Sequence, residues 1–441
     1  MAPVYFIVLL ILAGVSLATV IKKPVRIFEY PFFMAFAFSV FIAPQAFSLI
    51  RFPGEVEESS VDAVLLNACL CLIACFVGYK VSSSSVIMRW TTRPADMKRL
   101  FHVGVVFVGI SYGAGSLLSK TDVQYADTGG MTGAATIILF FAQLAYAGFA
   151  ILLFCLLHRP SFTTVVGFMA SAVPILQDVI TGRRENTAIV VLTIVMALFY
   201  ERRIHPPRLA IIGILVFSML AIPSTLEYRR YAKDSNWTGV RQIDLVGNFG
   251  HFLFEESILE LRNAAALIES TRKTGHYEFG AAYWNHLVFR YVPAQLLGND
   301  FKQSLMFDTW DLGKNGATET GFRFSRGSTV TGMGDTFQQF GWMGCIVFAF
   351  MGVLFKGMWK ASLAKNALFA RLLYILTFTS AMRAVTHWTL DFLPGLLYFA
   401  ICLGAAALYA GVPERRERGV RHRLAWRQTM LADRKMNGPV L

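Results

Sequence analysis

The sequence has few charged residues for its length. Only 16% of its 441 residues are charged, whereas an average soluble chain has about 25%. Hydrophobic residues make up 55%, and the mean hydropathy is +0.51. These values exclude a disordered chain, a coiled coil and an ordinary soluble enzyme. They predict an all-α, polytopic integral membrane protein, because many charge-free apolar runs approach the ~20 residues that one membrane crossing needs.

Several motifs of nucleotide and metal chemistry are absent. The chain has no GxxxxGK[ST] phosphate loop, no HExxH pair, no DxD pair and no Cys/His cluster, so we predict no cofactor and no metal site. The six cysteines all lie inside apolar runs, which excludes a disulfide framework and favours packing as small hydrophobes. No basic region precedes the first apolar run, so that run is expected to be a spanning helix rather than a cleavable signal peptide.

The apolar runs predict about eleven transmembrane helices. The candidate spans cover residues 3–20, 31–50, 61–79, 102–118, 132–157, 161–179, 186–200, 209–225, 336–356, 366–386 and 390–411. The net charge of +13 comes mostly from short segments between these runs, and these basic loops alternate with acidic or mixed loops. The positive-inside rule then predicts an outer N-terminus and a cytoplasmic C-terminus. The same distribution gives no reason to expect a nucleic-acid partner.

The chain is expected to divide into four parts. Residues 1–225 form an N-terminal bundle of about eight spans, and residues 226–335 form a large extracytoplasmic loop. Residues 336–412 form a C-terminal bundle of three spans, followed by a basic cytoplasmic tail at 413–441. Residues 251–268 and 280–298 have the apolar spacing and aromatic content of amphipathic helices, so the loop is expected to cover the outer end as interfacial helices.

Arginines gather on the predicted outer side, where the positive-inside rule disfavours them. They are Arg183, Arg184, Arg229, Arg230, Arg290, Arg323, Arg326 and Arg383. Each could pair with a carboxylate or extend to lipid headgroups. Several converging guanidinium groups, however, match the oxygens of a phosphate or pyrophosphate. A helix that begins after Gly182 would add a favourable dipole for an anion.

Other polar and aromatic residues of the same side are candidates for proton transfer and sugar binding. His387, Glu256 and Asp335 are possible general bases, although a single histidine at a helix end is more often structural. Asp178 lies inside a predicted span and is expected to pair with an arginine. Four aromatic residues could stack on sugar rings or anchor the chain at the membrane interface. They are Tyr283, Trp284, Tyr291 and Trp310.

Four segments between residues 181 and 399 resemble one protein family. They are TGRRENTAIVVLTIVMALF (181–199), YEFGAAYWNHLVFRYVPAQLLG (277–298), GSTVTGMGDTFQQFGWMGCIVFAFMG (327–352) and MRAVTHWTLDFLPGLLYF (382–399). Their order and spacing are similar to those of bacterial oligosaccharide repeat-unit polymerases, the Wzy-type O-antigen polymerase family. The N-terminal half of the chain resembles this family only in hydropathy.

The resemblance implies a membrane glycosyltransferase of metal-independent, inverting chemistry in the bacterial inner membrane, with its active site facing the periplasm. Its substrate would be an oligosaccharide unit on undecaprenyl pyrophosphate, and the growing chain would move to the non-reducing end of another such unit. Membrane lipid, a chain-length regulator and a flippase are the further candidate partners. By position, Arg183 or Arg184, Arg290 and Arg383 match the family's arginines, and His387 matches less securely.

Three other functions compete with polymerisation. An O-antigen ligase would transfer the chain to a different lipid acceptor, and the sequence separates it poorly from a polymerase. A transporter or flippase of lipid-linked glycans would have cations deep in the bundle and internal repeats, and we find no repeat. A structural scaffold would not need the cluster of arginines.

Overall fold

The computed structural model describes residues 1–82, 91–121, 124–125, 131–132, 134–182, 184–255, 259–309 and 329–412. Within these residues the chain is helical, apart from two paired two-residue strands. The strands are β1 (Gln124–Tyr125) and β2 (Met131–Thr132), antiparallel with Gln124 opposite Thr132. The expectation of an all-α chain is therefore confirmed in its architecture. The predicted basic tail at 413–441 lies outside the described residues.

The helices follow the chain in three groups. The first are α1 (Ala2–Lys22), η1 (Pro24–Phe28), α2 (Tyr30–Ala37), η2 (Phe38–Ile42), α3 (Ala43–Arg51), α4 (Glu58–Val81) and α5 (Met97–Leu118). Next are α6 (Ala134–Ala142), α7 (Leu144–His158), α8 (Phe162–Ile180), α9 (Arg184–Arg202), α10 (Arg208–Ala221), α11 (Thr225–Lys233), α12 (Trp237–Val240) and α13 (Leu245–Phe254). The last are α14 (Glu260–Thr274), α15 (Ala281–Tyr291), α16 (Ala294–Leu297), α17 (Asn299–Ser304), α19 (Thr331–Phe340), η4 (Gly341–Gly344), α20 (Cys345–Ser362), α21 (Leu368–Thr386), η5 (Thr389–Asp391) and α22 (Phe392–Ala410).

Nine helical stretches of the described chain are long and apolar enough to cross a membrane. A tenth would be the pair α10 and α11, which is bent by 71°. The expected span over 186–200 corresponds to α9, which carries Arg184, Glu185, Glu201 and Arg202 at its two ends and is not among the nine. The multi-pass character is thus supported, while the exact number of eleven spans stays a prediction.

The loops that are rich in basic residues meet at one end of the bundle, which we call the basic end. Arg202 donates a hydrogen bond to the Leu157 carbonyl, and Lys360 donates one to the Ser82 carbonyl. The backbone N–H of Val412 bonds the Pro94 carbonyl. These contacts join segments that the charge pattern assigns to the same side of the membrane.

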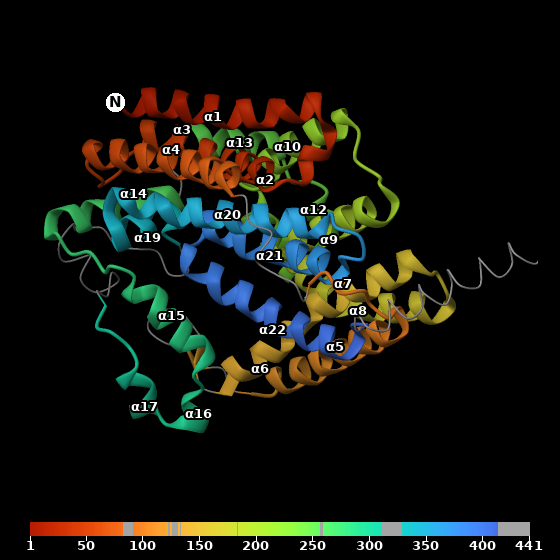
Figure 1. The fold of residues 1–441 in the computed structure, drawn as a ribbon. Helices are drawn as coiled ribbons and strands as arrows, with labels where there is room; N and C mark the ends of the chain where they lie inside the picture. Colours follow the sequence, from red (N-terminus) through yellow and green to blue (C-terminus); the bar gives the residue numbers. More distant parts are fainter. Residues whose placement is uncertain are drawn as a thin grey trace, which may run out of the picture.

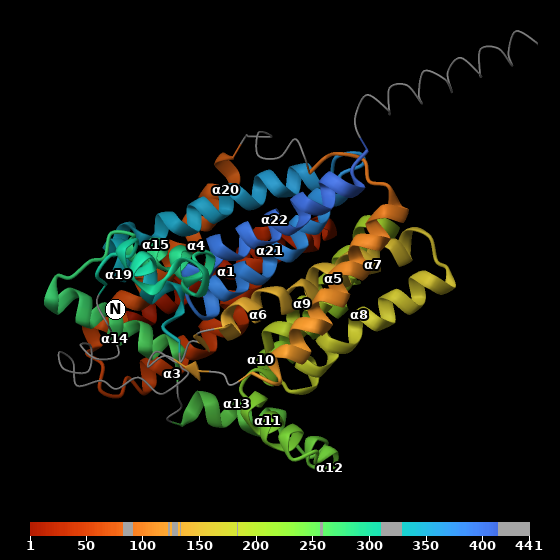
Figure 2. The ribbon, with the colours of Figure 1, turned by 90° about the horizontal axis from the view of Figure 1, so that it is seen from below.

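The helices pack side by side in an order that the sequence does not follow. Figures 1 and 2 show α1 and α4 on one side of the bundle and α5, α7 and α8 on the other, with α20, α21 and α22 between them. The central helices α2 and α21 are mostly buried, whereas α1 and α8 leave most of their surface exposed. Exposed apolar side chains on α1 and α8 are what a lipid-facing surface requires.

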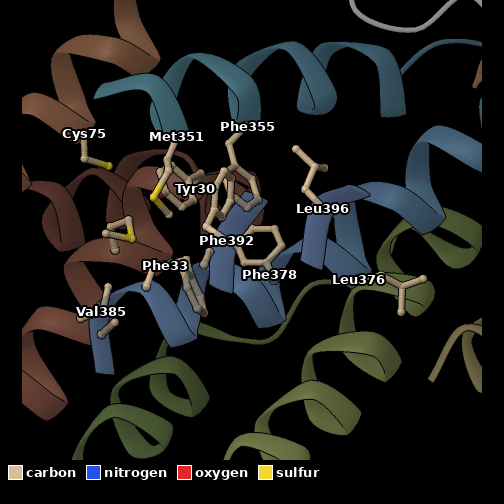
Figure 3. Close-up of a cluster of buried hydrophobic side chains, with 14 of the residues drawn as sticks. Tyr30, Phe33, Cys75, Met351, Phe355, Leu376, Phe378, Val385, Phe392 and Leu396 are labelled. Carbon is tan, nitrogen blue, oxygen red and sulfur yellow. The ribbon is translucent and has the colours of Figure 1, made fainter. Parts of the chain in front are cut away.

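Aromatic side chains fill the centre of the bundle. Tyr30 stacks on Phe355 with ring centroids 4.0 Å apart, and Phe378 packs edge-on against Phe33 and Phe355. Figure 3 shows these rings together with Met351 and Phe392, contributed by α2, α20, α21 and α22. Such interlocked rings contribute more than their buried area alone, so they stabilise the arrangement of these four helices.

The segment between residues 226 and 309 forms separate short helices rather than one domain. Figure 1 shows α15, α16 and α17 extending away from the bundle beside α22. The expected helix over 251–268 is instead divided between α13 and α14, and residues 256–258 lie outside the described residues. Most of α14 is buried against α4 and α19, which makes α14 part of the core. The expected interfacial position therefore does not apply to α14.

Candidate functional site

Arg383 links three helical elements at the end of the bundle opposite the basic end. Its Nε donates a hydrogen bond to Oε1 of Glu185 at 2.6 Å, and its Nη1 lies 3.6 Å from Oδ2 of Asp391. Arg383 is in the last turns of α21, Glu185 is in the first turn of α9, and Asp391 ends η5. Two carboxylates thus compensate the charge of this guanidinium group. Arg383 therefore joins α9, α21 and η5 through ion pairs within the protein.

Asp391 also binds a histidine that the sequence did not single out. His286, on α15, lies 2.8 Å through its Nε2 from Asp391 Oδ1, and Trp388 donates its Nε1–H to Oδ2. An ionised carboxylate only accepts hydrogen bonds, so Nε2 of His286 carries the hydrogen. The lone pair of a neutral His286 is then on Nδ1. A carboxylate that orients an imidazole in this way is the arrangement of a general base. We call Glu185, Arg383, Asp391 and His286 the Arg383 network.

Arg290 has a different environment although it is one helical turn from His286 on α15. Its Nη2 donates to Oε1 of Gln143 at 2.7 Å, and its guanidinium carbon lies 6.0 Å from the centre of the Tyr398 ring. The described chain supplies no carboxylate that pairs with Arg290. Side chains four residues apart share a helix face, so Arg290 and His286 project on the same side. A half-buried guanidinium with only neutral partners is suited to bind an anion.

The turn between α8 and α9 collects a second group of predicted residues. Arg229 donates its Nε–H to the Gly182 carbonyl at 3.0 Å, and Tyr228 donates its hydroxyl to the Ile180 carbonyl. Gly182 has a φ of +76°, and an added Cβ would lie 2.8 Å from the Tyr228 ring, so this position requires glycine. The turn also starts the helix that carries Glu185. Arg229 and the Arg383 network therefore meet at the same hairpin.

His387 is half-buried beside the network and bonds its own helix. Its Nδ1 lies 2.8 Å from the Thr386 hydroxyl, which itself donates to the Met382 carbonyl. The hydroxyl proton is already used, so Nδ1 of His387 carries the hydrogen and Nε2 has the lone pair. Burial lowers the pKa of His387 below its ordinary value. Two histidines, His286 and His387, are thus candidate bases at this end of the bundle.

Asp335 lies in the core of the same end, where Thr389 donates two hydrogen bonds to it. Its Oδ2 accepts the backbone N–H of Thr389 at 2.6 Å and the Thr389 hydroxyl at 2.8 Å. The Tyr283 hydroxyl in turn bonds the Thr389 hydroxyl. These bonds fix the turn between α21 and α22, on which Asp391 lies. The geometry thus supports a positioning role for Asp335, and its role as a base stays a prediction.

The predicted sugar-binding aromatics differ in how much of their ring is available. Tyr283 stacks on Phe340, and the Tyr291 hydroxyl donates to the Pro394 carbonyl at 2.6 Å. Trp284 donates its indole N–H to the Leu305 carbonyl but leaves its ring exposed. Of the three aromatics of this set that the structure describes, Trp284 is therefore the one best able to stack on a ligand.

Some predicted site residues cannot be compared with this geometry. Arg183, Glu256, Arg323 and Arg326 lie outside the described residues, as does Trp310. Arg184 begins α9, but its side chain is not among those described.

Two further predicted residues lie within the described part of the chain. Arg230 is exposed on α11. Asp178 is close to the Tyr146 hydroxyl. Among the residues that the structure describes, no group of three His, Cys, Asp or Glu side chains could hold a metal ion.

His286 shows what reasoning from the sequence missed. Its partner Asp391 is 105 residues away, so no local motif joins them. The available signal was the spacing of four residues between His286 and Arg290 in a segment already predicted to be helical.

In comparisons with known proteins, no family model, no curated protein and no solved structure matches this chain.

Proposed function

We propose that the protein polymerises lipid-linked oligosaccharide repeat units on the outer face of a bacterial inner membrane. The growing glycan would leave undecaprenyl pyrophosphate and join the non-reducing end of another lipid-linked unit. The observation that carries this proposal is Arg290, a half-buried guanidinium whose hydrogen-bonding partner is the neutral Gln143 and which shares a helix face with His286. The resemblance of residues 181–399 to Wzy-type polymerases supplies the substrate class.

In this proposal the two sides of the reaction use different residues. The acceptor hydroxyl gives its proton to the free Nδ1 of His286 while its oxygen bonds the anomeric carbon of the donor. The bond between that carbon and the pyrophosphate oxygen breaks, and the electron pair leaves with the pyrophosphate. Arg290 holds the added negative charge, which a preorganised cation stabilises most effectively away from water. Arg383 and Asp391 position His286 without contacting the substrate.

The exposed ring of Trp284 fits this division. It lies on α15 at the end of the bundle where the acceptor would have to bind, and because residues two apart on a helix do not share a face, it would contact a different part of the acceptor from the hydroxyl that meets His286. Sugar rings present apolar faces that pack on aromatic side chains, and an exposed indole offers a large surface for such a contact. Trp284 is accordingly proposed to bind the acceptor. Arg229 and Arg230, on α11, lie beside the turn between α8 and α9 at the same end.

Reconstitution tests the proposal directly. Purified protein in liposomes receives a lipid-linked repeat unit, and the products are separated on a gel. A ladder of products is expected from the wild type, and loss of the ladder from Arg290→Ala and His286→Gln. Arg241→Ala, which changes an exposed arginine at the C-terminal end of α12, is the matched control and should retain the ladder.

The other outcomes identify the competing functions. Transfer of a single unit to a separate lipid acceptor, with no ladder, would indicate a ligase. Movement of the intact unit across the bilayer without any new glycosidic bond would indicate a transporter. A full ladder from Arg290→Ala would reject the role proposed for this arginine.

A further inference from the structure

A polar cavity lies at the basic end, away from the Arg383 network. It has a volume of about 530 Å³, is open on one side, and is lined by the ends of α7 and α9, the loop between α20 and α21, the start of α21 and the segment before α5. Arg371, in its wall, precedes Arg383 by twelve residues on α21, which is roughly 18 Å along the helix. The cavity is therefore a separate site from the one described above. Its size is in the range of small-ligand pockets.

The charges that line this cavity are unbalanced. Glu201 is the single carboxylate of the lining, and it pairs with Arg371 at 3.1 Å and lies 3.7 Å from His158. Arg203 and Lys365 also line the cavity, and neither has a carboxylate partner in the described chain. The Arg203 guanidinium instead lies over the Phe199 ring. Two cationic side chains thus flank the cavity, and no carboxylate of the described residues compensates their charge.

Two residues at the rim of the cavity have a left-handed backbone conformation. Arg203 has a φ of +57° and Asn366 a φ of +62°, and both line the cavity. They are two of five non-glycine residues with a positive φ in the described chain. Such a conformation costs an arginine about 1–2 kcal/mol, whereas asparagine adopts it readily. The two residues belong to the same two loops that carry Arg203 and Lys365.

We propose that this cavity binds the phosphate group of an anionic ligand, with Arg203 and Lys365 contacting the phosphate oxygens. The Glu201–Arg371 pair would form the fixed wall, because Arg371 also donates to the Ser362 carbonyl. A cavity at the ends of spanning helices lies at the depth of phospholipid headgroups, and basic pockets between helices bind anionic headgroups. A soluble phosphate compound would offer the same oxygens. The shared chemistry is a phosphate anion, and its source can be measured.

The experiment compares two double variants of the full chain in phosphatidylcholine nanodiscs. The test variant carries Arg203→Gly and Lys365→Gln. Glycine adopts the positive φ of residue 203 without strain, so this variant should fold. The control variant carries Arg159→Gln and Arg208→Gln, two exposed basic residues of the same end that do not line the cavity. Native mass spectrometry measures bound phosphatidylglycerol, with inorganic pyrophosphate as the soluble probe.

Loss of the two lining cations should weaken phosphatidylglycerol binding about 25-fold, since each basic side chain contributes roughly fivefold. The control should differ little from the wild type. If pyrophosphate does not compete, the site takes a lipid headgroup. If pyrophosphate binds the wild type and not the test variant, while the lipid shows no preference, the ligand is a soluble phosphate. Equal binding of both probes to the wild type, the test variant and the control would overturn the proposal.

Discussion

Arg290 and Arg383 carry the same charge but have different partners, so their loss should have different effects. Removing Arg383 leaves Glu185 and Asp391 partly buried without a counter-charge. Breaking such a pair typically costs about 3 kcal/mol. We expect Arg383→Ala to lower the unfolding temperature of the purified protein clearly, whereas Arg290→Ala should leave it almost unchanged. An Arg383→Ala variant as stable as the wild type would show that the ion pairs contribute nothing.

The half-buried His387 predicts a dependence of stability on pH. Its pKa in the folded protein is lowered by burial, so the unfolded chain binds the proton more readily. The stabilising contribution is present above the unfolded pKa of about 6.5 and is lost as the pH falls below it. The unfolding temperature should therefore fall less between pH 7.5 and 5 in His387→Gln than in the wild type. His205→Gln, at an exposed position, serves as the control and should follow the wild type.

At the scale of single residues, the sequence predicts charges better than partners. Arg290 and Arg383 stand out because cations are unexpected on the predicted outer side. The partner Glu185 is 198 residues from Arg383, and Gln143 is 147 residues from Arg290. Pairing over such distances depends on the packing of whole helices, which no local pattern encodes. The sequence therefore could not distinguish a compensated arginine from an uncompensated one.

Two glycines allow helices α4 and α20 to pack closely. A Cβ on Gly352 would collide with the Cys75 carbonyl, and one on Gly78 would collide with the Ala349 carbonyl. The backbones of the two helices thus approach each other through reciprocal glycine contacts, as small residues permit in membranes. This contact supports the aromatic centre of the bundle, because Cys75 and Met351 lie beside Tyr30 in Figure 3.

Enlarging one of these glycines should separate the helices. We expect Gly352→Leu to reduce the yield of folded protein strongly, because overpacking costs at least 1–3 kcal/mol and a backbone carbonyl cannot move aside easily. Gly404→Ala in α22 meets no atom within 4 Å and should be neutral or stabilising by up to about 1 kcal/mol. Size-exclusion profiles and thermal unfolding measure both. Normal folding of Gly352→Leu would show that the close approach is dispensable.

At the scale of elements, hydropathy predicts the long apolar helices and fails at their interruptions. The run over 31–50 appears as α2, η2 and α3, and the expected start at 336 becomes α19 and η4 before α20. Contacts between distant segments, such as the hydrogen bond from Asn67 on α4 to the Met333 carbonyl on α19, accompany these interruptions and are not encoded by local hydropathy. The positions of the helices predicted in the loop are limited in the same way, because hydropathy does not show which distant helices cover them. The burial of α14 depends on α4 and α19, which are distant in the sequence.

The whole molecule has two polar ends, and each has a different proposed role. The Arg383 network and Arg290 lie at one end, and the phosphate cavity lies at the basic end. The alternation of loop charges predicted which loops share an end, because charge bias governs orientation in the membrane. The neighbours of each helix could not be predicted in the same way. Apolar helix surfaces are chemically alike, and their packing depends on shape.

Labelling of intact cells tests this division of the ends. A membrane-impermeant thiol reagent should modify Asp300→Cys, which is exposed near α15, and should not modify Lys365→Cys at the basic end. The six native cysteines lie in apolar segments, and five of them are buried, so background labelling should be low. Permeabilised cells should show both positions labelled. Labelling of Lys365→Cys alone in intact cells would reverse the orientation.

The most direct test of the central claim is the affinity of the purified protein for a polyprenyl pyrophosphate. If Arg290 holds the pyrophosphate, Arg290→Gln should weaken the dissociation constant roughly 10- to 100-fold, the effect of losing a charge-assisted hydrogen bond. The control Arg241→Gln should leave the constant within about twofold of the wild type, given the small effect of exposed charges. Equal affinities of the wild type and Arg290→Gln would contradict the claim that this arginine binds the lipid pyrophosphate.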